Sequence, residues 1–321
     1  MVRKYIALIL LSFALLRAGF IEILGGQKVG TTSMAFLKIG VGARAEGFGG
    51  AFVGLSDDPS ALHYNPGGVG FMKVPGVSFS HVRWFADISY EFMGLIVPLG
   101  KRGTIGIQAK VLHMPYMKVT DEYHPYGTGD YFTFGDRLLG ITYSKNMTDR
   151  FSFGFTLKAM EEQIADLRTR GFALDVGALY LVGYRDIRIG VALLNLGPDV
   201  RPSGDEGYSS FSIPILYRLG ASGFIFEGFR GLFEIEKASD QVEVFKAGAG
   251  YRLGPVELRC GYRLNNRIEG GKLSGFSFGV GFRVNRGTTG LVLDYAYGDM
   301  GLLGPVHRFS LNLSAGLLEG R

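Results

Sequence analysis

The chain has 321 residues, a formal net charge of +5 at neutral pH, 50 glycines and a single cysteine. One cysteine excludes a disulfide framework within the chain, and so modest a charge gives no reason to expect a nucleic-acid partner. Glycine is about twice as frequent as in an average protein, and the chain carries 25 Phe and 16 Tyr. This is not the composition of an ordinary soluble protein.

Residues 1–19 have the pattern of a secretory signal peptide. Arg3 and Lys4 form a positive n-region, and the apolar stretch 5–16 follows them. That stretch is far shorter than the roughly 20 residues that a membrane-spanning helix needs. A buried N-terminal helix is the alternative, but positive charge followed by an apolar run favours export, with cleavage near Ala18 or Gly19.

The segment 40–69 is rich in glycine and turn-forming residues, so it cannot hold one regular helix or strand over its length. Its apolar residues, such as Phe48, Phe52 and Leu55, need cover from other parts of the chain. We therefore predict that residues 20–75 form a compact, irregular plug, here called the hatch, which folds inside the remainder of the chain, residues 76–321.

Apolar and polar residues alternate with period 2 from Val77 to the C-terminus, which is typical of β-strands. Most predicted strands have ten residues or more, longer than the usual globular strand and suited to a tilted membrane strand. About fourteen are predicted, an even number as in bacterial outer-membrane barrels: 77–84, 88–98, 103–114, 132–144, 151–163, 168–182, 186–196, 214–226, 230–238, 243–253, 255–265, 273–284, 288–297 and 306–317.

Short and long connections alternate along the chain. The short ones are 99–102, 146–149, 183–185, 227–229, 254 and 285–287, and the long ones are 115–131, 164–168, 197–213, 266–272 and 298–305. Outer-membrane barrels have this asymmetry, whereas a soluble β-sandwich has no reason for it. We predict an all-β, transmembrane outer-membrane β-barrel of about 14 antiparallel strands, with the hatch in its lumen, integral to the outer membrane of a diderm bacterium.

The hatch carries a dense, ordered series of residues: Gly42, Arg44, Gly47, Gly49, Gly50, Asp57, Asp58, Asn65, Pro66 and Gly67. This series resembles the N-terminal signature of the PorV/PorQ family, which belongs to the FadL superfamily of long-chain fatty acid transporters. The resemblance implies a 14-stranded barrel with an N-terminal hatch. It departs at one point, since the family usually has Asn-Pro-Ala where this chain has Asn65-Pro66-Gly67; glycine loosens that turn but keeps the side chain small.

Charged hatch residues would be costly in the lumen unless they are paired. We expect Arg44, Glu46, Asp57 and Asp58 to pair with wall residues, and the inward phase of the strands offers these candidates: Glu257, Arg259, Arg263 and Arg283.

Aromatic and methionine residues gather at predicted outer positions, namely Trp84, Phe85, Met114, Tyr116, Met117 and Tyr123. They form either an interfacial aromatic girdle or a rim that captures an apolar ligand or an extended polypeptide. The first interpretation is the commoner one in barrels, and both remain open.

No residue set in the chain predicts catalysis, a cofactor or a metal. The run from Gly40 to Ala45 fits G-x-G-x-x-A, but the glycines after it would break the helix that dinucleotide binding needs. The five histidines have no ligand spacing, and alternation puts Ser80 and His81 on opposite faces of a strand. Cys260 falls in the lipid-facing phase.

We therefore expect a non-enzymatic barrel. The resemblance to PorV implies docking and hand-over of proteins exported by the type IX secretion system. The resemblance to FadL implies the alternative, a passive transporter of long-chain fatty acids or other hydrophobic small molecules. The expected partners are outer-membrane lipid and either a hydrophobic small molecule or a secreted polypeptide.

Overall fold

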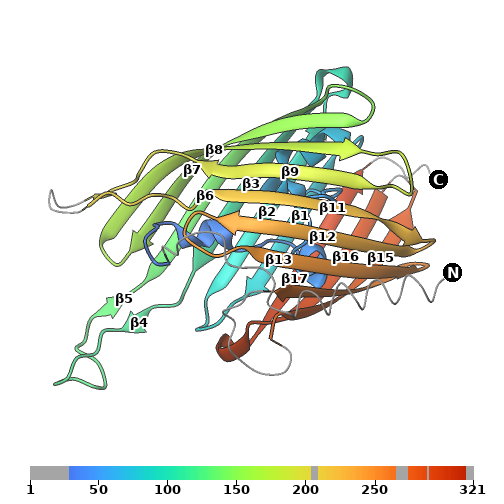
Figure 1. Cartoon of the computed structure of the whole chain (residues 1–321). Helices are drawn as coiled ribbons and strands as arrows, with labels where there is room; N and C mark the ends of the chain where they lie inside the picture. Colours follow the sequence, from blue (N-terminus) through green and yellow to red (C-terminus); the bar gives the residue numbers. More distant parts are fainter. Residues whose placement is uncertain (1–28, 204–208, 265–273, 288, 316–321) are drawn as a thin grey trace.

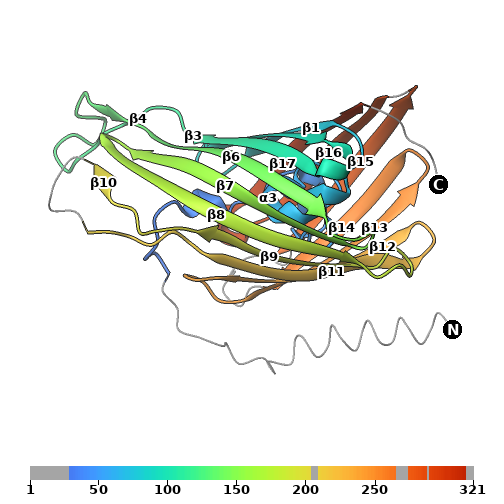
Figure 2. The same ribbon diagram turned by 90° about the horizontal axis from the view of Figure 1, so that it is seen from above.

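The structure, a computed structural model, describes residues 29–203, 209–264, 274–287 and 289–315. The predicted signal peptide, residues 1–19, lies outside these ranges. Within them, fourteen long strands form one antiparallel sheet, and the pairing of β8 with β9 closes that sheet into a barrel (Figures 1 and 2). The predicted fold and the predicted number of strands are confirmed.

Each long strand lies within a few residues of its predicted range. The wall consists of β1 (Gly76–Arg83), β2 (Ser89–Pro98), β3 (Thr104–His113), β6 (Phe134–Asn146), β7 (Phe151–Ile164), β8 (Leu167–Leu181), β9 (Arg188–Leu196), β11 (Leu216–Phe226), β12 (Phe229–Ala238), β13 (Val244–Leu253), β14 (Val256–Leu264), β15 (Phe276–Arg286), β16 (Thr289–Asp299) and β17 (Pro305–Ala315).

The shorter elements lie in the connections. Strands β4 (Met117–Lys118) and β5 (Tyr131–Phe132) pair only with each other, in a hairpin that projects from one end of the barrel (Figure 1). Strand β10 (Pro202–Ser203) pairs with β8. Two 3₁₀ turns, η3 (Gly100–Arg102) and η4 (Gly301–Leu303), join wall strands.

Alternation along each strand sorts the two faces of the wall. On β7, Phe153 and Leu157 point outward and are 43% and 60% exposed, whereas Thr156 and Lys158 point into the lumen and are buried. So much exposed apolar surface suits contact with lipid. A closed ring also leaves no unpaired strand edge, which the hydrocarbon region of a membrane would not tolerate.

The links between strands lie at the two ends of the barrel, which we call the turn end and the loop end. Links such as 147–150 and 254–255 lie at the turn end, and the β4–β5 hairpin lies at the loop end. One predicted long loop, 164–168, proves short, because β7 and β8 extend until only Ala165 and Asp166 join them. Ala165 turns the chain there with a φ of 51°.

The described part of the hatch, residues 29–75, precedes β1 and lies inside the barrel (Figures 1 and 2). It consists of short turns linked by irregular backbone, as its glycines and prolines predict: η1 (Ala35–Lys38), α2 (Ala43–Gly47), α3 (Ala61–Tyr64) and η2 (Pro66–Phe71). Among the described residues, no helix has the length and apolar character needed to span a membrane.

Candidate functional site

Backbone groups of the hatch bind side chains of the wall. The amide of Gly42 donates to Ser80 Oγ, and the amide of Ala43 donates to Ser310 Oγ, each over 3.1 Å. The amides of Phe52 and Val53 both donate to one carboxylate oxygen of Glu234, each over 2.8 Å. Irregular backbone in a closed lumen needs such partners, since it lacks the regular backbone hydrogen bonds of a helix or a sheet.

Sequence reasoning did not single out these three wall residues, Ser80, Ser310 and Glu234, as partners of the hatch. Each occupies an inward position of its strand, so alternation would have placed it in the lumen. Alternation does not predict which turn of the hatch lies opposite each strand. The contacts of Ser310 and Glu234 with the hatch, for example, join residues more than a hundred positions apart in the sequence.

The turn from Asn65 to Gly67 lies against strand β8. Asn65 Nδ2 donates to the carbonyl oxygens of Val53 and Ala178, each over 3.0 Å, and Asn65 Oδ1 accepts from the amide of Gly67 over 2.9 Å. Pro66 occupies the first position of η2, where its missing N–H costs nothing. The Asn side chain thus links two parts of the hatch to the wall.

Gly67 explains the departure from Asn-Pro-Ala. A Cβ at this position would lie 2.7 Å from Ala178 Cα and 2.8 Å from the carbonyl oxygen of Gly177, closer than real Cβ atoms come. From the sequence we expected glycine to loosen the turn while keeping the side chain small. In the structure its missing Cβ is what allows the hatch backbone to meet the backbone of β8.

The predicted hatch glycines also meet the wall closely. A Cβ at Gly47 would lie 3.1 Å from Gly279 Cα, and a Cβ at Gly49 would lie 2.9 Å from the amide nitrogen of Tyr262. Gly50 has a φ of 77°, which an L side chain rarely adopts, and it follows directly on Gly49. These glycines therefore serve close packing of the hatch against β13–β15.

Glu46 is buried between two arginines of the wall. Its carboxylate pairs with Arg263, one of the predicted partners, and with Arg308 Nη1 at 2.5 Å, which was not predicted. Burial alone would raise the pKa of Glu46, but the two guanidinium groups outweigh it and hold that pKa below its usual value. The pair of arginines therefore keeps Glu46 ionised.

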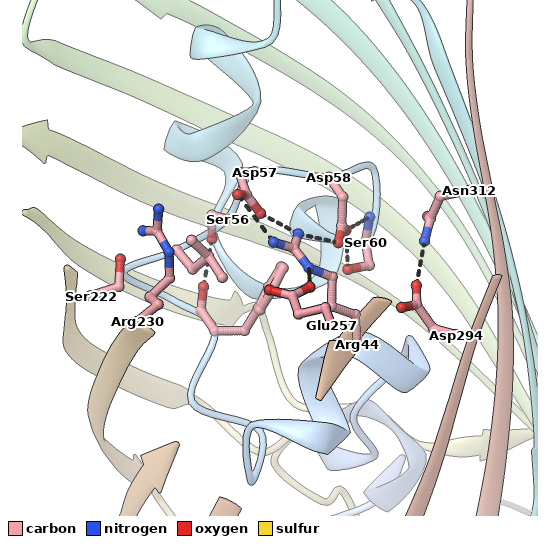
Figure 3. Close-up of polar contacts among 12 residues, drawn as sticks. Arg44, Ser56, Asp57, Asp58, Ser60, Ser222, Arg230, Glu257, Asp294 and Asn312 are labelled. Carbon is pink, nitrogen blue, oxygen red and sulfur yellow. Dashed lines mark hydrogen bonds and ion pairs between the residues drawn. The ribbon is translucent and has the colours of Figure 1, made fainter. Parts of the chain in front are cut away.

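Arg44, Asp57 and Asp58 bind mainly one another (Figure 3). Arg44 Nη1 lies 2.5 Å from Asp57 Oδ1 and 3.0 Å from Asp58 Oδ2, while Glu257 of β14 lies 3.8 Å from Arg44 Nε. The expectation that these charges would be neutralised by the wall therefore holds only in part. Most of the pairing joins two separate turns of the hatch.

The two neighbouring carboxyl groups differ in their titration. Burial opposes ionisation of both. For Asp57 the guanidinium groups of Arg44 and Arg188 outweigh burial and lower the pKa, whereas burial together with the charge of Asp57 raises the pKa of Asp58. Asp58 is held by Ser60, whose amide and hydroxyl both donate to Asp58 Oδ1.

A layer of buried charges crosses the middle of the lumen. Lys110 Nζ donates to His63 Nδ1 over 2.6 Å, because burial and nearby cations lower the pKa of His63 well below its ordinary value and keep the ring neutral. Most other cations of the layer face a carboxylate, and the pairs are Lys158–Asp175, Arg218–Glu236, Lys246–Glu236 and Arg259–Asp294. Arg259, which was predicted to pair with a charge of the hatch, thus pairs with Asp294 of the wall instead.

An apolar layer lies nearer the loop end. It joins η1 of the hatch to inward side chains of several strands, and its members include Met34, Phe36, Leu37, Tyr90, Leu112, Leu138, Met160 and Val306. Trp84 packs against this cluster, with its ring 5.6 Å from the guanidinium carbon of Arg308, and the ring of Phe85 lies 5.3 Å from that of Trp84.

The predicted rim therefore falls into two parts. Trp84 and Phe85 lie half-buried at the mouth of the barrel, and Met114 is half-buried at the start of the next loop. Tyr116, Met117 and Tyr123 lie on the projecting β4–β5 hairpin and are 75%, 48% and 86% exposed. The two parts thus differ in exposure, and the role of the rim stays a prediction.

A cavity of about 880 Å³ lies between the hatch and the wall at the turn end. We call it the turn-end cavity. Part of its lining is apolar and includes Phe71 of η2, Met72, which caps the end of η2, and Val292 of β16. Another part is cationic and includes Arg188 and Arg283. The described lumen thus holds an apolar layer, a set of buried charge pairs and an open cavity at the turn end.

Other chemistry considered from the sequence finds no support in these contacts. Ser80 faces the lumen, whereas His81 faces outward and bonds Glu91 over 2.8 Å, so the two cannot act together. Helix α2 is too short for a dinucleotide site and follows no strand. Among the described residues, no group of His, Cys, Asp and Glu side chains could hold a metal ion.

The fold is that of FadL-type outer-membrane channels. The crystal structures of the toluene transporter TodX from Pseudomonas putida (TM-score 0.61, 88% of this chain and 99% of that one) and of the toluene transporter TbuX from Ralstonia pickettii (0.57, 87% and 99%) resemble it at 12% identity. A FadL homologue from Pseudomonas aeruginosa gives 0.54, with 12% identity and the same coverage as TbuX.

The chain itself belongs to UPF0164, an uncharacterised protein family whose model matches residues 17–193. That match includes the whole hatch and β1 to β8. No curated protein matches the sequence.

Proposed function

We propose that this chain is a non-enzymatic channel of the outer membrane that passes hydrophobic small molecules. The observation that carries the proposal is a barrel of FadL type whose lumen is filled by a hatch, which packs against the wall in an apolar layer nearer the loop end and leaves the turn-end cavity open at the other end. Structures of similar fold are described as toluene and monoaromatic hydrocarbon channels, which supports the same class of solute here.

Uptake of labelled toluene and of a labelled long-chain fatty acid tests this proposal. Both solutes would enter cells of a host that lacks its own channel of this kind, with and without the chain in the outer membrane. We expect faster uptake of at least one solute with the chain, and no change for a labelled sugar. Equal uptake of both hydrophobic solutes with and without a folded chain would contradict the proposal.

A second candidate function is docking of exported polypeptides, as the resemblance to PorV/PorQ implies. The exposed tyrosines of the β4–β5 hairpin favour it, because such side chains are common in protein interfaces. The similarity of the fold to hydrocarbon channels favours transport instead. Genes for other type IX components beside this one, and cargo with a C-terminal sorting domain, would be expected for docking, and their complete absence would exclude it.

A further inference from the structure

The arginines that line the turn-end cavity are not equally paired. Arg188 and Arg230 share Asp186, which lies 2.8 Å and 2.6 Å from them, and Arg44 is held by Asp57 and Asp58. These three cations therefore have carboxylate partners within the protein.

Arg252 and Arg283 differ from them. Arg252 Nη2 comes no closer than 3.9 Å to Glu257 Oε1, and Glu257 is already held by Arg259 Nη2 at 2.5 Å. Among the residues that the structure describes, the guanidinium of Arg283 makes no hydrogen bond and no ion pair within 4 Å, and only the more distant charges of Glu257 and Asp57 attract it. Both side chains line the turn-end cavity.

Sheet register brings the two arginines together on one stretch of the inner wall. Arg252 of β13 is paired with Glu257 of β14, which in turn is paired with Gly281 of β15. Arg283 follows two residues later, on the same face of β15 and closer to the turn end. A guanidinium group without a partner favours a carboxylate or a phosphate, which it can bind through two parallel hydrogen bonds.

Apolar side chains of the hatch line the same cavity, namely Phe71, Met72 and Val74. Charged hatch residues Asp57, Asp58 and Lys73 line it as well, and Val292 of β16 lies beside Arg283 as its cross-strand partner. A small inorganic anion would leave the apolar side chains in contact with water, whereas an alkyl chain would cover them. The cavity therefore offers guanidinium groups to an anionic group and apolar side chains to a hydrocarbon portion.

We propose that the turn-end cavity binds an amphipathic anion, whose carboxylate or phosphate lies between Arg252 and Arg283 and whose alkyl portion lies against the hatch. The inference rests on the proposed channel function, since the cavity is where a solute would leave the lumen. A neutral hydrocarbon would not use the two arginines.

Equilibrium binding to the full chain, purified in a non-ionic detergent, tests this site with hexanoate, hexyl phosphate, hexanol and inorganic phosphate. Hexanoate and hexyl phosphate should bind about tenfold or more tightly than hexanol, in line with a charge-assisted hydrogen bond. Arg283→Gln and Arg252→Gln should each weaken hexanoate binding about tenfold. Arg286→Gln, on the exposed outward face of the same strand, is the matched control and should change nothing.

Each contrary result has a distinct meaning. Equal binding of hexanol and hexanoate would overturn the site. So would hexanoate binding that neither cavity variant weakens, provided that the electrophoretic mobility of the unheated variants shows a folded barrel. Inorganic phosphate binding as tightly as hexyl phosphate would overturn the amphipathic ligand. Passage of toluene without binding of hexanoate would overturn the site alone, while binding without passage of any solute would overturn the channel function alone.

Discussion

Gly67 lies where the backbone of the hatch meets the backbone of β8, with no room for a methyl group. Gly67→Ala should therefore destabilise the protein by about 1–3 kcal/mol, as overpacking of a tight contact does. Urea unfolding in lipid vesicles would measure this loss. Gly231→Ala is the control, because its added methyl would meet only the movable side chain of Ile225, at 3.0 Å. Equal stability of the Gly67 variant and the native chain would contradict the close contact.

Glu46 joins α2 to two strands of the wall, and its pKa is lowered in the folded state. Because the folded pKa lies below the unfolded value of 4.5, the stabilisation is fully present above that pH and is lost as the pH falls through the folded pKa. Glu46→Gln should cost about 3–5 kcal/mol at neutral pH by leaving two buried guanidinium groups without their carboxylate.

The same variant should flatten the dependence of stability on pH below about 4.5. Unfolding by urea at several pH values between neutral and strongly acid would show both effects. Glu161→Gln serves as the control, since the exposed pair of Glu161 with Arg170 should contribute little. If the stability of Glu46→Gln falls with pH below about 4.5 as steeply as that of the native chain, other carboxylates govern acid unfolding.

At the scale of elements, the strands were predictable and the lumen contacts were not. Period-2 alternation in β15 and β17 marks both faces of the wall directly in the sequence, so the predicted ranges differ from the observed ones by a few residues. The hatch has no period, and its path depends on long-range contacts such as that of Asn65 with Ala178. Glycines and turn residues predicted its irregularity but not which strand each turn meets.

The turn-end cavity was also beyond sequence reasoning. Alternation places Arg252 and Arg283 in the lumen, and Arg283 was expected to pair with a hatch charge. Which arginines obtain a carboxylate depends on the competition for Asp186 and Glu257, and that competition depends on three-dimensional distances. A buried charge must be paired somewhere, but the sequence does not say with which partner.

A disulfide between η2 and β6 would show whether the hatch moves. A Cβ at Gly70 would lie 2.8 Å from Ser144 Oγ, so cysteines at these two positions are close enough to bond. It would also lie 2.2 Å from Ser152 Oγ, so every variant of this test carries Ser152→Ala to make room. The apolar and charged layers must part for a solute to pass, so we expect the oxidised Gly70→Cys, Ser144→Cys chain to lose uptake and a reductant to restore it.

This tether requires a background free of other thiols, which Cys260→Ser provides, since Cys260 is the chain's single cysteine and lies on the outer face. The two single-cysteine variants control for the substitutions themselves. Uptake that is equally fast in the oxidised and reduced double variant would contradict a moving hatch and would mean that solutes pass around a fixed one.

The whole molecule is a wide barrel whose lumen is occupied by its own N-terminal segment, and we expect that segment to exclude polar solutes. Fourteen strands enclose more space than wall side chains alone would fill. The hatch occupies that space with an apolar layer, a charged layer and paired backbone, while the wall strands form a ring that closes without it through the β8–β9 pair. Barrier and wall are thus separable in the structure.

Liposome swelling in a sugar solution tests that separation. The intact chain should give no swelling above protein-free liposomes, because no polar solute of that size passes the filled lumen. Deletion of residues 29–72 should permit rapid swelling, since the remaining ring is wide enough to hold water. A variant with Tyr116→Ala and Tyr123→Ala on the exposed hairpin is the control and should behave as the intact chain. Swelling of liposomes that hold the intact chain would contradict this division of roles. The absence of swelling with the deletion variant would also contradict it, provided that the electrophoretic mobility of the unheated variant shows a closed barrel.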